Sequence, residues 1–434
     1  MSDGSFGGFV ARAAADGELV VQPRMGVGDP AAMRAGLAAV RAAGVRAVGT
    51  ITLDSFTRVG DHDAVRAALA AGDALNGYPI VAYPPRTTRD VLRGVAGDAF
   101  PVQVRHGSAR PQDIVVALLD AGLHATEGGP LSYCLPYSRV PVAEAVRAWA
   151  ESCLLLAELR DRGGRPHLES FGGCMMGQLC PPGLLVAISV LEALFFRRHG
   201  LDSVSLSYAQ QTHAGQDAEA VLALRTLAAE HLSDVDWHVV LYTYMGVFPR
   251  TRRGASALLE QAAELAVRTG AERLIVKTTA EAHRIPTVEE NVTALRTASR
   301  AAARAARGGT NAVPPEDSGV LAEARAIVEA VLDLAPDLGV ALVRAVERGY
   351  LDVPYCLHPD NAGRTRAVVD RTGRLRWSRT GSLPLAGVVG ATAGPGATGA
   401  EITSTELLRS LSHVERTFDD AALDRVGAHP IGSG

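Results

Sequence analysis

The sequence predicts an α/β fold, and within that class a (β/α)8 TIM barrel with a small C-terminal α+β extension. Short apolar segments alternate with longer helical ones along most of the 434 residues, a pattern typical of a parallel sheet with crossover helices. The apolar segments are nearly continuous, as expected when both faces of a sheet are covered. No GxGxxG motif follows the first of them and nothing divides the series into two halves, so a closed barrel is favoured over an open doubly wound sheet.

Nine segments are candidate strands, one more than a barrel needs, and helical stretches separate them. The candidate strands are, in chain order, 18–24, 47–55, 78–83, 101–107, 124–129, 165–172, 203–210, 237–246 and 273–281. Helices are expected at 29–43, 62–75, 88–96, 111–121, 141–163 and 182–199, and after each of the last three strands. The segment HATEGG at 124–129 is the least strand-like, so we expect it to lie outside the barrel.

Three parts are expected along the chain. Residues 1–17 form an N-terminal leader, residues 18–306 the catalytic barrel, and residues 307–434 a helical and hairpin extension. The stretch 305–319 is rich in Gly and Pro and is predicted to be a linker. Beyond it, helices are expected at 320–336 and 338–348, and RAVVDRTGRLRWSR predicts a hairpin that turns at Thr372 and Gly373.

Composition limits the partners. The net charge of −4 gives no electrostatic reason to expect nucleic acid or an anionic membrane surface. No apolar run is long enough for a membrane span and the first residues do not resemble a signal peptide, so we expect a cytoplasmic protein. Its five cysteines are odd in number and irregularly spaced, which indicates reduced thiols, and no cluster has the spacing of a metal site.

The most informative residues are the charged ones where strands end. Arg24, Arg58 and Arg105 each follow a predicted strand, and such strands end at the same face of a barrel. At ~4 Å and an effective dielectric of ~20, each like-charge pair costs about 4 kcal/mol, and a buried arginine needs a partner. An anionic ligand with more than one carboxylate or phosphate would supply it. Carboxylate is favoured, because the guanidinium fork suits it and the late loops lack the Gly-rich form of phosphate sites. When the negative charge of Glu127 is added to the three positive charges, an acidic amino acid fits such a site.

Other polar and aromatic residues near the strand ends have more than one interpretation. His106, Tyr133 and Tyr137 could contact a ligand or simply pack, and Phe171 is more often a core residue than a substrate platform. Lys277 ends a buried run and must be paired or face a ligand, with Glu281, four residues on, as its simplest partner. From the residues alone, the chain is a barrel that binds a small polyanionic metabolite, and no reaction follows.

The same segments resemble, in the same order, the large (epsilon) subunit of glutamate mutase, the methylaspartate mutase family. The resemblance spans roughly residues 18–365 and is carried by many short motifs. They are QPRMGV (22–27), LDSFTR (53–58), LNGYP (75–79), RHG (105–107), EGGPLSYCLPYSRV (127–140), FGG (171–173), PPG (181–183), MGVFP (245–249), VKTTAEAHRIPT (276–287) and DNAG (360–363).

The resemblance implies a site for L-glutamate. By position, Arg24, Arg58 and Arg105 would hold its two carboxylates, leaving Arg105 unpaired by the protein itself, and Glu127 would accept its ammonium. Residues implied around the substrate, with Glu127 and His106 as the catalytic candidates, are His106, Tyr133, Tyr137 and Phe171. Residues implied around the adenosyl group of adenosylcobalamin are Lys277 and Glu281 at the ribose, with Gly26, Thr52, Asn76 and Met245 beside them.

The implied reaction is an isomerisation of L-glutamate to (2S,3S)-3-methylaspartate by radical carbon-skeleton rearrangement. The chain lacks the DxHxxG motif of cobalamin-binding modules, so the resemblance implies a separate small cobalamin-binding subunit and a dimer of large subunits. Two departures are Pro130 in place of a third glycine and 242–244, Tyr-Thr-Tyr, in place of His-Gln-Trp. A mutase acting on another amino acid, or a non-catalytic binding subunit with the same barrel, remain the alternatives.

Overall fold

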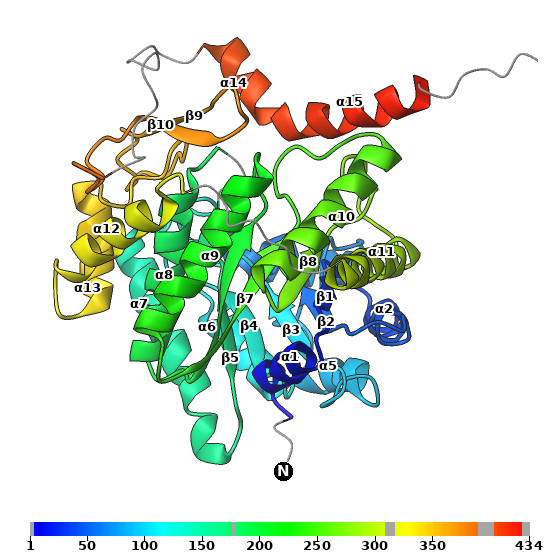
Figure 1. Cartoon of the computed structure of the whole chain (residues 1–434). Helices are drawn as coiled ribbons and strands as arrows, with labels where there is room; N and C mark the ends of the chain where they lie inside the picture. The colour runs from blue at the N-terminus through cyan, green and yellow to red at the C-terminus, as the bar shows by residue number, and fades with distance from the viewer. Residues whose placement is uncertain (1–3, 176–178, 309–316, 389–402, 428–434) are drawn as a thin grey trace, which may run out of the picture.

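A computed structural model describes residues 4–175, 179–308, 317–388 and 403–427. Eight parallel strands form one sheet in the order β1-β8-β7-β6-β5-β4-β3-β2, which curves into a nearly closed barrel (Figure 1). The strands are β1 (Val20–Pro23), β2 (Gly49–Thr52), β3 (Val102–Arg105), β4 (Ala125–Gly128), β5 (His167–Ser170), β6 (Ser203–Ala209), β7 (Asp236–Tyr242) and β8 (Arg273–Val276). The predicted (β/α)8 barrel is confirmed.

The barrel closes between β1 and β2 through a short seam. Val21 forms an isolated parallel bridge with Ala47, and the Val48 amide donates to the Val21 carbonyl at 3.3 Å. Further along, the Thr52 amide donates to the Met25 carbonyl at 2.9 Å. These few bonds take the place of a continuous ladder between the two strands.

The prediction about which candidate strand lies outside the barrel is wrong. HATEGG contributes β4, which pairs with both β3 and β5, and its Thr126 and Glu127 are polar although fully buried. The segment 78–83 is the one outside: Tyr78 makes only an isolated bridge to Leu53, and a turn follows. Pro79 and Pro84 explain this, because a proline cannot donate a hydrogen bond to a sheet ladder.

Helices surround the barrel and connect its strands. They are α2 (Pro30–Arg41), α3 (Ser55–Val59), α4 (His62–Ala71), α5 (Pro85–Leu92), α6 (Gln112–Asp120), α7 (Val142–Ala157), α8 (Pro182–Arg198), α9 (Ala214–His231), α10 (Arg252–Thr269) and α11 (Val288–Arg307), with 3-10 turns η1 (Arg160–Arg162) and η2 (Gly172–Cys174). Helix α8 is buried from Pro182 to Phe196, since the barrel covers one side and C-terminal helices cover another.

A helix that the sequence did not indicate closes the amino-terminal end of the barrel. Helix α1 (Phe6–Ala15) lies within the expected leader, and it packs its apolar side against the first residues of three strands (Figure 1). The cluster consists of Phe6, Phe9, Val10, Ala13, Val20, Val48 and Ala125. Phe6 also stacks on the His167 ring with 5.0 Å between centroids, so the helix shields the polar interior of the barrel from this side.

The C-terminal extension packs over the side and the carboxyl-terminal end of the barrel (Figure 1). It comprises α12 (Val320–Leu332), α13 (Leu338–Arg348), the hairpin β9 (Arg366–Val369) and β10 (Leu375–Arg379), α14 (Ser404–Leu411) and α15 (His413–Gly427). The hairpin turns where expected, with Gly373 at a φ of +88°, and Trp377 on β10 donates to Glu323 of α12 at 3.1 Å. Most of the predicted linker lies outside the described residues.

Candidate active site

The expected site residues follow the carboxyl ends of seven of the eight strands. Because all strands are parallel, these ends meet at one mouth of the barrel. Arg24 and Gly26 follow β1; Thr52 and Arg58 end or follow β2; Arg105 and His106 end β3; Glu127, Tyr133 and Tyr137 lie on or after β4; Phe171 follows β5; Met245 follows β7; Lys277 and Glu281 follow β8. Asn76 lies in the segment that leads to Tyr78.

The structure brings the expected substrate residues together. The Tyr133 ring lies 6.0 Å from Tyr137 and 5.1 Å from Phe171, measured between centroids, and 5.1 Å from His106. Tyr133 and Phe171 are buried, whereas Tyr137 is 49% exposed and lies at the outer edge of this group. These rings form an aromatic wall beside the charged residues.

Arg105 is not unpaired, contrary to expectation. Its Nε donates to Glu127 Oε2 at 2.6 Å, and both side chains are buried. The neighbouring strands β3 and β4 are paired at Val104 and Thr126, which sets the next residue of each strand side by side. Burial alone would lower the pKa of Arg105, but Glu127, Tyr242 and Tyr133 outweigh it and hold this pKa well above its usual value.

Arg58 is the arginine without a carboxylate. Among the described residues, none of its nitrogens makes an ion pair, and its Nε donates to the Leu53 carbonyl at 2.9 Å. Burial, and then proximity to the cations Arg24 and Arg105, lower its pKa against the opposing effects of Tyr133 and Glu127. Arg24 is half-buried and lies 3.5 Å from Glu281. The three guanidinium groups, here called the arginine cluster, therefore share one site.

A one-turn helix orients Arg58. The Asp54 carboxylate caps α3 by accepting the amides of Phe56 at 2.9 Å and Thr57 at 3.0 Å, which are free donors at a helix start. The amide of Ser55 donates to Asn76 Oδ1 at 3.0 Å, so Asn76 supports this turn.

His106 presents a buried N–H group. Its Nδ1 accepts the Ser108 amide at 3.0 Å, so in the neutral ring the proton is on Nε2. This nitrogen is buried and makes no well-formed hydrogen bond in the described part of the chain, although the Glu127 backbone lies close enough to raise the pKa of the ring slightly. Burial, and then Arg58 and Arg105, lower the pKa of His106 to about 3, so the ring stays neutral. A neutral N–H beside the arginine cluster is suited to a carboxylate oxygen.

The residues expected around a nucleoside lie on the side of the mouth formed by β7, β8, β1 and β2. A Cβ on Gly26 would lie 2.1 Å from the Thr52 carbonyl oxygen, so only glycine fits there, and Thr52 Oγ1 is buried without a partner in the described part of the chain. Lys277 is buried over the Phe248 ring, 5.1 Å from its centroid, and burial followed by Arg24 lowers its pKa to about 8. Unused donors and a close backbone approach fit a ribose with its hydroxyl groups.

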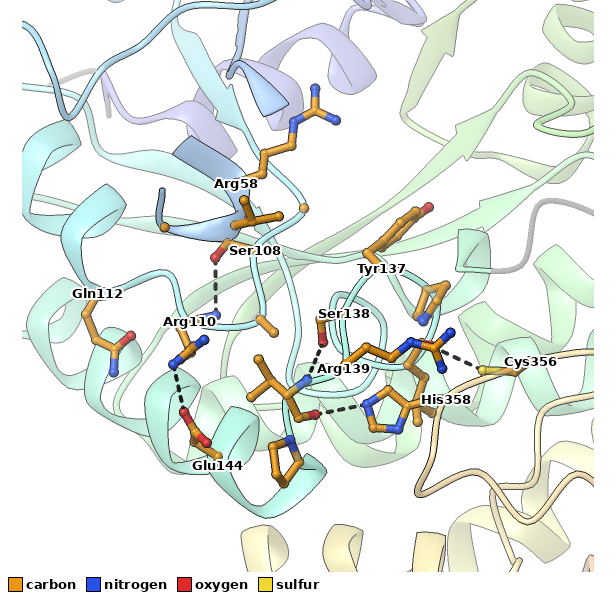
Figure 2. A pocket seen from close by; sticks show the side chains of 18 of the residues that line it. Arg58, Ser108, Arg110, Gln112, Tyr137, Ser138, Arg139, Glu144, Cys356 and His358 are labelled. Carbon is orange, nitrogen blue, oxygen red and sulfur yellow. Dashed lines mark hydrogen bonds and ion pairs between the residues drawn. The ribbon is translucent and has the colours of Figure 1, made fainter. Parts of the chain in front are cut away.

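A groove adjoins the site and connects it to the surface. Its cavity of about 1370 Å³ is lined by residues after β2, β3 and β4 and by the C-terminal segment 355–358, and Arg58 and Tyr137 belong to both groove and site. Figure 2 shows these two side chains on one side of the groove and the Arg110–Glu144 ion pair, 3.1 Å long, on the other. The segment 355–358 holds the loop that carries Tyr137, because His358 Nε2 lies 2.9 Å from the Val140 carbonyl oxygen.

Three buried polar residues of this region were not predicted. Tyr242 at the end of β7 contacts Arg105, Glu127 and also Glu169, and Glu169 pairs with Arg273 inside the barrel. The sequence did offer a signal for two of them: Glu169 in HLES and Arg273 in RLIV are charged residues in apolar strands. A buried charge needs a partner elsewhere in the fold.

Two kinds of feature are absent from the described residues. No group of three or more His, Cys, Asp or Glu side chains there could hold a metal ion. No helix in the described part of the chain has the length and apolar character needed to cross a membrane.

Comparison with known proteins identifies the family. Residues 2–393 match the family model of the methylaspartate mutase E chain (MutE). The chain is similar to the glutamate mutase epsilon subunit of Yersinia enterocolitica, at 31% identity over 352 residues that cover 77% of this chain and 72% of the relative. It is 32% identical to the glutamate mutase epsilon subunit of Halobacterium salinarum over 344 residues, which cover 77% and 71% of the two chains. The chain belongs to the methylaspartate mutase E chain family.

Proposed function

We propose that this chain is the substrate-binding subunit of an adenosylcobalamin-dependent glutamate mutase that interconverts L-glutamate and (2S,3S)-3-methylaspartate. The observation that carries the proposal is Arg58, a half-buried guanidinium that has no carboxylate partner among the described residues and lies beside two more arginines. A cation in this position needs an anionic ligand.

The charges of the site favour a dicarboxylic amino acid. Arg24, Arg58, Arg105 and Lys277 are the cations, and Glu127 and Glu281 are the carboxylates, which leaves two positive charges. L-Glutamate, with one net negative charge, reduces this excess. Its carboxylates would bind the arginine cluster and the His106 Nε2–H.

Glu127 keeps one acceptor position for an ammonium group. Its Oε1 accepts from the Tyr133 hydroxyl, and its Oε2 is engaged by Arg105 and Tyr242. Each carboxylate oxygen has two acceptor positions, so Oε1 retains one. We infer that the amino group of the substrate donates to this atom, and that Tyr133, Tyr137 and Phe171 exclude water around it.

The residues on the other side of the mouth would hold the adenosyl part of the cofactor. Lys277, Glu281 and Thr52 supply donors and acceptors for a ribose, Gly26 and Met245 line its place, and Asn76 supports the α3 turn. When bound, adenosylcobalamin supplies the radical that carbon-skeleton rearrangement needs. The contribution of this chain is to fix the substrate by ionic contacts at several points while it reacts. A separate small subunit would bind the cobalamin, and two large subunits would form a dimer.

Reconstitution tests this proposal. The purified chain alone should give no product from L-glutamate, whereas the chain mixed with a DxHxxG-containing small subunit and adenosylcobalamin should form 3-methylaspartate, followed by proton NMR. Calorimetry on the assembled complex should detect binding of L-glutamate but much weaker binding of L-glutamine, which lacks the second carboxylate. Turnover without cobalamin, or a complex that binds neither amino acid, would refute the proposal.

A further inference from the structure

We propose that Tyr242 is a positioning residue of this site: its hydroxyl joins Glu127 to a second buried carboxyl group, Glu169, and so fixes the oxygen that receives the amino group of the substrate. The proposal rests on the proposed function only for the identity of that substrate. Tyr242 stands where the family resemblance has a histidine, so the residue type itself gave no indication of this role.

The geometry centres on the phenolic oxygen of Tyr242. This oxygen lies 2.8 Å from Glu127 Oε2 and contacts Glu169 Oε1, and it accepts a hydrogen bond from Arg105 Nη2 at 3.2 Å. The ring is fully buried, with the Arg105 guanidinium 5.1 Å from its centroid and Phe171 edge-on at 5.6 Å. Both the ring and the hydroxyl of Tyr242 therefore contact residues of the expected substrate site.

Glu169 gives this contact a rigid base. Arg273 donates to Glu169 Oε2, and the Gln103 Nε2 also donates to it at 3.2 Å. Arg273 in turn donates to Gln22 and, at 3.1 Å, to Ser205, and none of these side chains reaches solvent. A continuous set of polar contacts thus runs from the middle of the barrel through Glu169 and Tyr242 to Glu127.

The consequence for binding is that Glu127 cannot rotate freely. Tyr242 and Arg105 occupy both acceptor positions of Oε2, so Oε1 is the oxygen left to face the ligand. Without the Tyr242 hydroxyl, Oε2 would regain an acceptor position and the carboxylate would lose its link to Glu169.

The test uses the assembled complex and the variant Tyr242→Phe, which keeps the ring and its packing. Loss of a hydrogen bond to a charged group predicts a roughly 10- to 100-fold rise in the dissociation constant for L-glutamate, measured by calorimetry. Because the contact acts on ground state and transition state alike, KM should rise while kcat changes little. The matched control is Tyr208→Phe, an equally buried tyrosine whose hydroxyl donates to Asp217 at 3.0 Å outside the site, and it should leave L-glutamate binding unchanged.

A double variant distinguishes an effect of Tyr242 that acts through Glu127 from a nonspecific structural effect of the substitution. In a Glu127→Gln background, Tyr242→Phe should have little further effect on affinity, because its action passes through Glu127. Equal effects in both backgrounds, or unchanged affinity in the single variant, would overturn the inference. If Tyr242→Phe does not fold, Glu169→Gln serves instead and should weaken binding in the same direction. A wild-type complex that fails to bind L-glutamate would refute the proposed function rather than this role of Tyr242.

Discussion

At the scale of single residues, the three arginines of the cluster differ in what they can still bind. Arg105 already uses Nε for Glu127 and Nη2 for Tyr242, and Arg24 lies near Glu281. Within the described ranges Arg58 uses only its Nε, for a carbonyl, and both terminal nitrogens are left for a ligand. We therefore expect Arg58 to make the principal two-point contact with a substrate carboxylate.

The variant Arg58→Lys tests this expectation. An ammonium cannot reproduce the planar pair of donors, so affinity for L-glutamate should fall at least about tenfold even though the charge is kept. Calorimetry on the assembled complex measures the change. The control is Arg110→Lys, which alters an arginine of the adjoining groove that is already paired with Glu144 and should bind L-glutamate normally. Wild-type affinity in Arg58→Lys would remove Arg58 from the site.

The sequence identified the charged members of the site but not how they pair. Charged residues at predicted strand ends were enough to place Arg24, Arg58 and Arg105 at one mouth of the barrel. Glu127 was grouped with them by its charge, although its segment was expected to lie outside the barrel. The pairing of Arg105 with Glu127 depends on the register between β3 and β4, and the two residues are 22 positions apart in the sequence. Local sequence carries no information on such a register.

At the scale of elements, the alternation of strands and helices was readable because apolar runs and turn residues are local signals. That signal was not sufficient to decide which candidate segment lies outside the barrel: we expected 124–129, but it is 78–83. A barrel strand that ends in the site carries polar residues such as Glu127, whereas the more apolar YPIVAY contains a proline and forms a turn. Helix α1 was missed since its short apolar pattern lies among glycines and alanines near the start of the chain.

Helix α1 provides a prediction at this scale. Phe6 is 4% exposed, stacks on His167, and lies under the Arg273 guanidinium at 5.0 Å. Phe6→Ala should lower the free energy of unfolding by about 3–5 kcal/mol, the usual cost of removing a buried aromatic ring. Urea unfolding followed by circular dichroism measures it. Leu222→Ala, at a position 40% exposed on α9, should cost well under half as much, and equal losses would contradict the role of α1 as a barrel cover.

At the scale of the whole molecule, two sets of buried ionisable groups should determine how the free energy of unfolding depends on pH: histidines with lowered pKa values and carboxyl groups with raised ones. Burial, with nearby cations, lowers the pKa of His106, His167 and His238, that of His106 to about 3. Below their ordinary pKa of about 6.5 the unfolded chain binds protons that the native protein does not, so acid removes stability. Burial raises the pKa of Glu192 and Asp217 to about 7, which has the opposite sign between about pH 4 and 7.

The two effects should largely offset each other between about pH 4.5 and 6.5, and below about pH 4 the raised carboxyl groups no longer offset the histidines. Each histidine whose native pKa lies lower still then contributes about 1.4 kcal/mol per pH unit. The free energy of unfolding, measured in urea at several pH values, should therefore change little down to about pH 4.5 and fall steeply below about pH 4. The variant His167→Gln should show a shallower acid decline, and a slope equal to that of the wild type would contradict the assignment.

The seam between β1 and β2 restricts which amino acids can replace Gly26. At Gly26, even a methyl side chain would clash with the Thr52 backbone and push the segment after β1 away from β2. This shift would move Arg24 away from Arg58 and Arg105. Position 26 can thus accept no mutation without widening the ring of strands. Related proteins that keep the three arginines in this arrangement should therefore also keep glycine at this position.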